Sequence, residues 1–125
     1  MSLKILYVED EADIRAVAQI ALETVGGFSL CQCASGEEAL QRAAECAPDL
    51  LLLDVMMPGM DGPTTLLRLR GLPATAQTPA IFMTAKVQPS EIAHFKSLGA
   101  LDVIAKPFDP MALADQVRRI MGGGA

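Results

Sequence analysis

Residues 49–62 read DLLLLDVMMPGMDG, four consecutive leucines bounded by aspartates and followed by a Pro-Gly turn. An apolar run without polar alternation is typical of a strand covered on both faces. This stretch therefore predicts a central strand deep inside the molecule, ending at Asp54. A carboxylate that terminates such a strand is costly unless it is exposed, paired or bound to a metal ion.

Four further apolar runs rich in Val, Ile and Leu alternate with segments of helical period. This alternation favours parallel strands joined by helical crossovers, and hence an α/β fold. The five expected strands are Lys4–Val8, Phe28–Cys33, Asp49–Asp54, Ala80–Thr84 and Leu101–Ala105.

The helical segments have apolar spacings and terminal signals. The first is expected to bury Ile14, Val17, Ala18, Ala21 and Val25 before it ends at Gly26-Gly27. Ser35 with Glu38 predicts a capping box at the start of the second helix. Three prolines are expected in the first turns of the last three helices, the last of them behind an Asp109 N-cap: Pro63, Pro89 and Pro110.

Length and composition indicate one folded domain, expected at residues 1–121, with residues 122–125 as a flexible tail. With 51% apolar and 20% charged residues in 125, the chain lies outside disordered compositions. A net charge of -5 argues against direct binding to nucleic acid or anionic lipid. The absence of a long apolar run and the early acids of the Met1–Asp10 segment argue against a membrane span or signal peptide, so we expect a cytoplasmic protein.

The three cysteines are an odd number and too few for a disulfide-stapled secreted scaffold. Cys31 and Cys33 lie two residues apart in an expected strand and should share one face. We expect buried thiols at these two positions rather than a zinc site.

Reactive side chains follow four of the five strands. Glu9 and Asp10 follow the first strand, Asp54 ends the third, Thr84 ends the fourth and Lys106 follows the fifth. The second strand has no comparable group. Because ligands of open α/β sheets bind beyond the carboxyl ends of the strands, we expect these groups to converge on one crevice.

Three carboxylates in one crevice repel one another by about 4 kcal/mol per pair at about 4 Å. A cation must therefore lie among them, and hard oxygen ligands suit Mg²⁺ better than zinc. Lys106 offers a point charge and Thr84 a hydroxyl, both suited to phosphate oxygens. The set predicts a metal-assisted phosphoryl site with a carboxylate nucleophile.

Four motifs in chain order, Glu9-Asp10, the 54–62 segment DVMMPGMDG, Thr84-Ala85 and Lys106-Pro107-Phe108, resemble the receiver domain of bacterial two-component response regulators. The resemblance to this CheY-like family covers the whole chain. It implies a flavodoxin-like (βα)5 domain whose five-stranded parallel sheet has the order 2-1-3-4-5, with helices on both faces.

The resemblance implies that Asp54 accepts a phosphoryl group from a histidine kinase or a histidine phosphotransfer protein. It implies a Mg²⁺ ion, for which Mn²⁺ can substitute. Its ligands would be Asp10 and Asp54 directly, the backbone carbonyl of Met56, and Glu9 through water.

In the same family the phosphoryl oxygens bind at positions matching Thr84 and the backbone N–H of Ala85, and Lys106 would pair with the new charge. The Lys106-Pro107 bond is expected to be cis. Such a domain assists its own phosphotransfer and dephosphorylation but is not an enzyme. If the chain is a complete protein, its signal passes to an unidentified downstream protein, through the face formed by the fourth helix, fifth strand and fifth helix.

One position departs from the family pattern, and other functions stay open. Val103 stands where many members carry an aromatic switch residue, which leaves a phosphorylation-independent adaptor as an alternative. An aspartyl-nucleophile phosphohydrolase commonly has a second acid at the place of Met56, and a flavodoxin has a Ser/Thr/Gly-rich loop where this chain has acids. Both are disfavoured.

Overall fold

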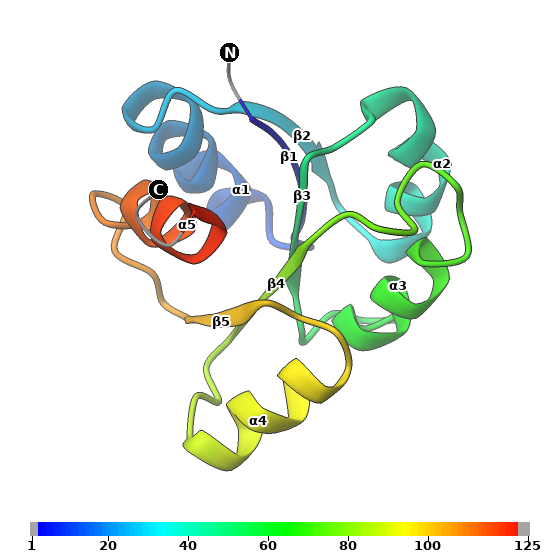
Figure 1. The fold of residues 1–125 in the computed structure, drawn as a ribbon. Helices are drawn as coiled ribbons and strands as arrows, with labels where there is room; N and C mark the ends of the chain where they lie inside the picture. Colours follow the sequence, from blue (N-terminus) through cyan, green and yellow to red (C-terminus); the bar gives the residue numbers. More distant parts are fainter. Residues whose placement is uncertain (1–2, 123–125) are drawn as a thin grey trace.

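The computed structural model describes residues 3–122, in which strands and helices alternate along the chain (Figure 1). The strands are β1 (Lys4–Val8), β2 (Ser29–Cys33), β3 (Leu50–Asp54), β4 (Ala80–Thr84) and β5 (Asp102–Ala105). The helices are α1 (Ala12–Gln19), α2 (Gly36–Cys46), α3 (Gly62–Leu69), α4 (Pro89–Ser97) and α5 (Leu113–Gly122), and a π-helical segment, η1 (Ile20–Val25), continues α1. Every expected strand is confirmed to within one residue at each end.

The five strands form one parallel sheet in the order β2-β1-β3-β4-β5, which confirms the expected (βα)5 fold. β3 lies at the centre of the sheet, and all five of its residues are buried. The leucine run therefore forms the middle of the sheet, and Asp54 lies at its carboxyl end.

Helices cover both faces of the sheet, with α1, η1 and α5 on one side and α2 and α3 on the other (Figure 1). Leu51 and Leu53 pack in the core under α2 and α3, whereas Leu50 and Leu52 pack under α1 and α5. Because successive strand residues point to opposite faces, four leucines serve both cores. Each buried leucine contributes about 1.5–3 kcal/mol to the stability of the fold. This contribution offsets the cost of burying the Asp54 carboxylate at the end of β3.

The first helix differs from its expected apolar face. Its buried stripe runs through Ala18, Ala21 and Leu22, whereas Val17 and Val25 are 40% and 45% exposed. The prediction was wrong for both valines. Val25 lies in η1, which has more residues per turn than an α-helix and so moves its side chain around the axis, whereas Val17 precedes η1 and lies on the exposed side of α1.

The helix starts follow the expected chemistry except at α5. Of the capping box expected at α2, the Ser35 half forms, because Ser35 Oγ accepts a hydrogen bond from the Glu38 N–H at 3.1 Å. The Glu38 carboxylate accepts from the Ala34 N–H at 2.7 Å rather than from the Ser35 N–H. Pro63 and Pro89 lie in the first turns of α3 and α4. The expectation for Pro110 was wrong, since α5 begins three residues later at Leu113 after a turn held by Asp109.

The cysteine expectation is corrected in part. Cys31 and Cys33 do share one face, and Cys33 is a buried free thiol. Cys31 of β2 and Cys46 at the end of α2, however, form a disulfide with Cα atoms 6.5 Å apart. The helix packs its last turn over the strand, which gives a separation that a disulfide can span.

α5 includes Gly122, the first residue of the expected tail, and residues 123–125 lie outside the described part of the chain. Within residues 3–122, no helix is long and apolar enough to span a bilayer.

Candidate functional site

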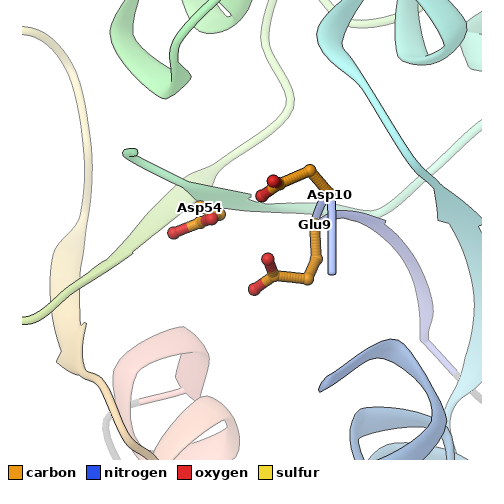
Figure 2. Close-up of side chains that lie close together, drawn as sticks. All are labelled: Glu9, Asp10 and Asp54. Atoms are coloured by element: carbon orange, nitrogen blue, oxygen red, sulfur yellow. The ribbon is translucent and has the colours of Figure 1, made fainter. Parts of the chain in front are cut away.

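Three acidic side chains meet at the carboxyl end of the central strands, as expected. Glu9 and Asp10 follow β1, Asp54 ends β3, and these two strands are direct neighbours in the sheet. One carboxylate oxygen from each residue lies within 4.8 Å of the others, and Figure 2 shows the three side chains close together at this end of the strands. Glu9 is fully buried and Asp54 is 2% exposed, so water screens their repulsion little.

Lys106 places an ammonium group among these acids. Its Nζ donates to Glu9 Oε1 at 2.8 Å and to Asp54 Oδ1 at 3.1 Å. Three carboxylates facing one ammonium leave two uncompensated negative charges. One divalent cation would compensate this excess.

Glu9 is held by groups that the sequence analysis missed. Its Oε2 accepts from the Glu11 N–H at 3.2 Å, and its Oε1 accepts from the Tyr7 hydroxyl at 3.4 Å. Arg15 Nη1 of α1 donates to the Glu9 backbone carbonyl at 2.7 Å. The sequence spacing could have indicated the contact with Tyr7, because Tyr7 and Glu9 are two residues apart and so lie on the same side of the sheet.

Burial and charge shift the protonation of the site. Burial, followed by the charge of Glu9, raises the pKa of Asp54 to about 6, although the hydrogen bond from Lys106 works against the increase. Partial burial opposes the charged form of Lys106, yet its hydrogen bonds to Glu9 and Asp54 raise its pKa. Burial and the nearby Glu9 and Asp54 charges raise the pKa of Tyr7, so its phenol stays protonated at neutral pH.

β4 and β5 bring two further expected residues to the same sheet edge. Asp54 lies opposite Met83 in the β3–β4 register, which places Thr84 one residue beyond it. Thr84 is 2% exposed, and its Oγ1 accepts from the Lys86 N–H at 3.1 Å. The Lys106 N–H donates to the Thr84 carbonyl at 2.9 Å, and the Lys106-Pro107 bond is cis, as expected.

The remaining expected residues lie in the loops above this edge. Ala85 directly follows β4, and Met56 follows β3 with its side chain 70% exposed. Gly62 closes the β3–α3 loop, and a Cβ on it would lie 2.5 Å from the Asp54 carbonyl oxygen. Gly62 carries no polar or apolar signal in the sequence, because its role depends on this close backbone approach.

Val103, the residue that departs from the family pattern, borders a groove. Val103 of β5 is half-buried against the core under α2 and α3. On its outer side a groove of about 480 Å³ lies between α4, β5 and α5, lined by Val87, Ile92, Val103, Ile104, Gln116 and Ile120, among others.

The donor set of the acidic cluster fits magnesium. It consists of carboxylate oxygens without histidine or thiolate. Hard oxygen donors with room for water are the ligands that Mg²⁺ takes, whereas zinc prefers nitrogen and sulfur. Glu9, Asp10 and Asp54 are therefore the residues that could hold such an ion.

Residues 5–118 match the family model described as "Response regulator receiver domain". The phosphate regulon transcriptional regulatory protein PhoB of Rhizobium meliloti (strain 1021) is 37% identical over 118 residues, which cover 94% of this chain and 52% of PhoB. The response regulator PleD of Caulobacter vibrioides (strain NA1000 / CB15N) is 37% identical over 121 residues, covering 96% of this chain and 26% of PleD. The chain thus spans about half the length of PhoB, and less of PleD.

Two solved structures also match nearly the whole chain. The chemotaxis protein CheY4 of Vibrio cholerae matches with a TM-score of 0.87 at 29% identity, covering 96% of this chain and 99% of that one. A putative response regulator from Chloroflexus aurantiacus matches with a TM-score of 0.84 at 35% identity, covering 97% and 98% of the two chains.

Proposed function

Since the chain belongs to the receiver domains of two-component response regulators, we propose that it is a signalling switch that accepts a phosphoryl group on Asp54. The donor would be the phosphohistidine of a histidine kinase or of a histidine phosphotransfer protein. The observation that carries the proposal is the contact set of Asp54, a buried carboxylate bonded to Lys106 and beside two further acids.

In the transfer, a carboxylate oxygen of Asp54 attacks the donor phosphorus. The phosphorus–nitrogen bond of the phosphohistidine breaks, the imidazole nitrogen keeps the bonding pair and takes up a proton, and Asp54 becomes an acyl phosphate. Attack of water on that phosphorus later restores the carboxylate and releases inorganic phosphate. Both steps rest on positioning and charge stabilisation.

We assign the remaining site residues to binding roles. Glu9, Asp10, Asp54 and the Met56 carbonyl would hold Mg²⁺, which supplies the positive charge that lets an anionic donor approach an anionic acceptor. Lys106 would shift from its contacts with Glu9 and Asp54 toward the new phosphoryl charge.

Thr84 and Ala85 would bind the phosphoryl oxygens. Thr84 Oγ1 is an acceptor in its hydrogen bond with Lys86, so its own proton is available for donation. Movement of the β4–α4 loop toward the phosphoryl group would then select between two conformers of the domain.

We propose that the output passes to another protein through the face formed by α4, β5 and α5. The open groove beside Val103 and the apolar side chains that line it support this choice. We also propose that the protein acts in the cytoplasm, as the family does in general.

The proposal is tested by incubating the protein with acetyl phosphate and Mg²⁺ and measuring intact mass. We expect one labile phosphoryl adduct that is lost in Asp54→Asn and in the presence of a chelator. Asp49→Asn is the matched control, because Asp49 lies at the opposite end of β3 and bonds the Lys4 N–H. Absence of any adduct on folded wild-type protein would refute the proposal and favour the phosphorylation-independent adaptor, and steady turnover of a small phosphate ester would favour a phosphohydrolase.

A further inference from the structure

The buried hydroxyl of Tyr7 has its hydrogen-bond partner in the acidic cluster. Tyr7 is fully buried on β1, a strand paired on both sides, and its ring packs in the core under α1 and α5. Its hydroxyl donates to Glu9 Oε1, the same oxygen that accepts from Lys106. A buried phenol requires such a partner, and this one is a carboxylate of the site rather than a structural carbonyl.

The two donors on Glu9 Oε1 differ in how firmly they are tied to it. Lys106 Nζ lies at 2.8 Å and is shared with Asp54, whereas the Tyr7 hydroxyl lies at 3.4 Å and has no second partner among the described residues. A phosphoryl group on Asp54 adds negative charge on the Asp54 side of the ammonium. A shift of Nζ toward that charge lengthens its bond to Glu9 and leaves Oε1 short of a donor.

We propose that Tyr7 is a positioning residue of this site, whose hydroxyl becomes the principal donor to Glu9 Oε1 when Lys106 turns to the phosphoryl group. The Tyr7–Glu9 bond then shortens to about 2.7 Å, the usual length for a hydroxyl on a carboxylate. The hydroxyl thus stabilises the phosphorylated arrangement more than the resting one, which makes it a contributor to the transfer step. The contribution of Tyr7 to the transfer step rests on the proposed function, whereas the Tyr7–Glu9 contact in the resting protein does not.

A spectroscopic test uses the composition of the chain, which has one tyrosine and no tryptophan. Tyrosine emission therefore reports on Tyr7 alone, and a hydrogen bond to a carboxylate quenches it. In protein freed of metal by a chelator, we expect Glu9→Gln to increase the emission and Lys106→Ala to decrease it, because Tyr7 then takes over Oε1. Equal emission in the wild type and both variants would overturn the proposal, whether or not Asp54 can be phosphorylated.

A kinetic test separates positioning from packing. In Tyr7→Phe, which keeps the ring, we expect the rate of adduct formation from acetyl phosphate at saturating Mg²⁺ to fall about three- to tenfold. This is the size of one ordinary hydrogen bond, because the Tyr7–Glu9 contact already exists in the resting protein and only its strengthening affects the rate. The Mg²⁺ concentration for half-saturation should change less than about twofold, because Lys106 still holds Glu9 in the resting protein.

The matched background is Glu9→Gln, in which the carboxylate that Tyr7 orients is gone. There, Tyr7→Phe should change the rate by less than about 1.5-fold. A Tyr7→Phe protein with the wild-type rate, or with the same loss in both backgrounds, would show that the ring matters only for packing and would overturn the proposal. Wild-type protein that forms no adduct would refute the proposed function instead, and the emission test would still decide the Tyr7–Glu9 contact.

Discussion

Replacing Asp54 by asparagine is expected to stabilise the metal-free protein at neutral pH. The pKa of Asp54 lies at about 6, against an ordinary value of 3.8, mainly because of burial and the Glu9 charge. A difference of about two pKa units corresponds to about 3 kcal/mol of cost for the ionised form in the folded state. An asparagine side chain at this position carries no charge and avoids this cost.

The pH dependence has a definite sign. Between about pH 4 and pH 6 the folded protein binds more protons at Asp54 than the unfolded chain does, so the free energy of unfolding decreases as pH rises through this range. The contribution of Asp54 to the stability of the folded state is fully present below the pKa of the unfolded chain and is lost as the pH rises through the folded pKa of about 6. The stability advantage of Asp54→Asn should therefore be near zero at the acid end and approach about 3 kcal/mol above pH 7.

Urea denaturation followed by circular dichroism, with chelator present and at several pH values, measures this difference. Asp49→Asn at the opposite end of β3 is the control and should show no such increase with pH. Added Mg²⁺ at about a hundred times its dissociation constant should stabilise the wild type by about 2.7 kcal/mol and Asp54→Asn far less. The reasoning is refuted if Asp54→Asn is less stable than the wild type at pH 7.5, or if their difference does not vary with pH.

Three further outcomes are expected. Because protons compete with the metal for Asp54, Mg²⁺ affinity measured by calorimetry should fall about tenfold per pH unit below about pH 6, and a flat profile would contradict the site. Intact mass and thiol titration in denaturant should find one free thiol in the oxidised protein. Reduction of the Cys31–Cys46 disulfide, which joins residues 15 apart, should lower the free energy of unfolding by about 3 kcal/mol. In Cys31→Ser, which cannot form this disulfide, reduction should have no such effect. Ser35→Ala should lower stability by about 1 kcal/mol in thermal unfolding, and Ser35→Asp should restore it, whereas equal losses would exclude a capping role.

The sheet was predictable because β3 and its neighbours are continuous apolar runs bounded by polar residues. Those runs give strand positions but not their order, which came from the family resemblance and is confirmed by the pairing of β1 with both β2 and β3. The π-helical η1 could not be read from spacing, because an apolar stripe assumes one constant helical period. The Cys31–Cys46 bond depends on how α2 packs over β2, which no local pattern encodes.

The charged part of the site was predictable for a related reason. Parallel strands end at one edge, so polar residues after successive strands must meet, and the contacts of Lys106 with Glu9 and Asp54 confirm this. Tyr7 escaped detection because an aromatic residue inside a strand is ordinarily core, and its ring is indeed core. Only its hydroxyl belongs to the site, and a hydroxyl at the end of a buried ring leaves no mark in an apolar pattern.

The charge of the site indicates where a phosphorylation signal would begin. One divalent cation would balance the three carboxylates and Lys106, so the loaded resting site is close to neutral. On the proposed function, an acyl phosphate replaces one carboxylate charge with about two, and an excess negative charge reappears at the end of β3. The Lys106 charge is already counted in this balance, so its shift toward the phosphoryl group cannot offset the excess, and the Thr84 hydroxyl on the neighbouring strand has a proton to donate. On the proposed function, the response would therefore begin in the β4–α4 loop and would not require a ring at Val103.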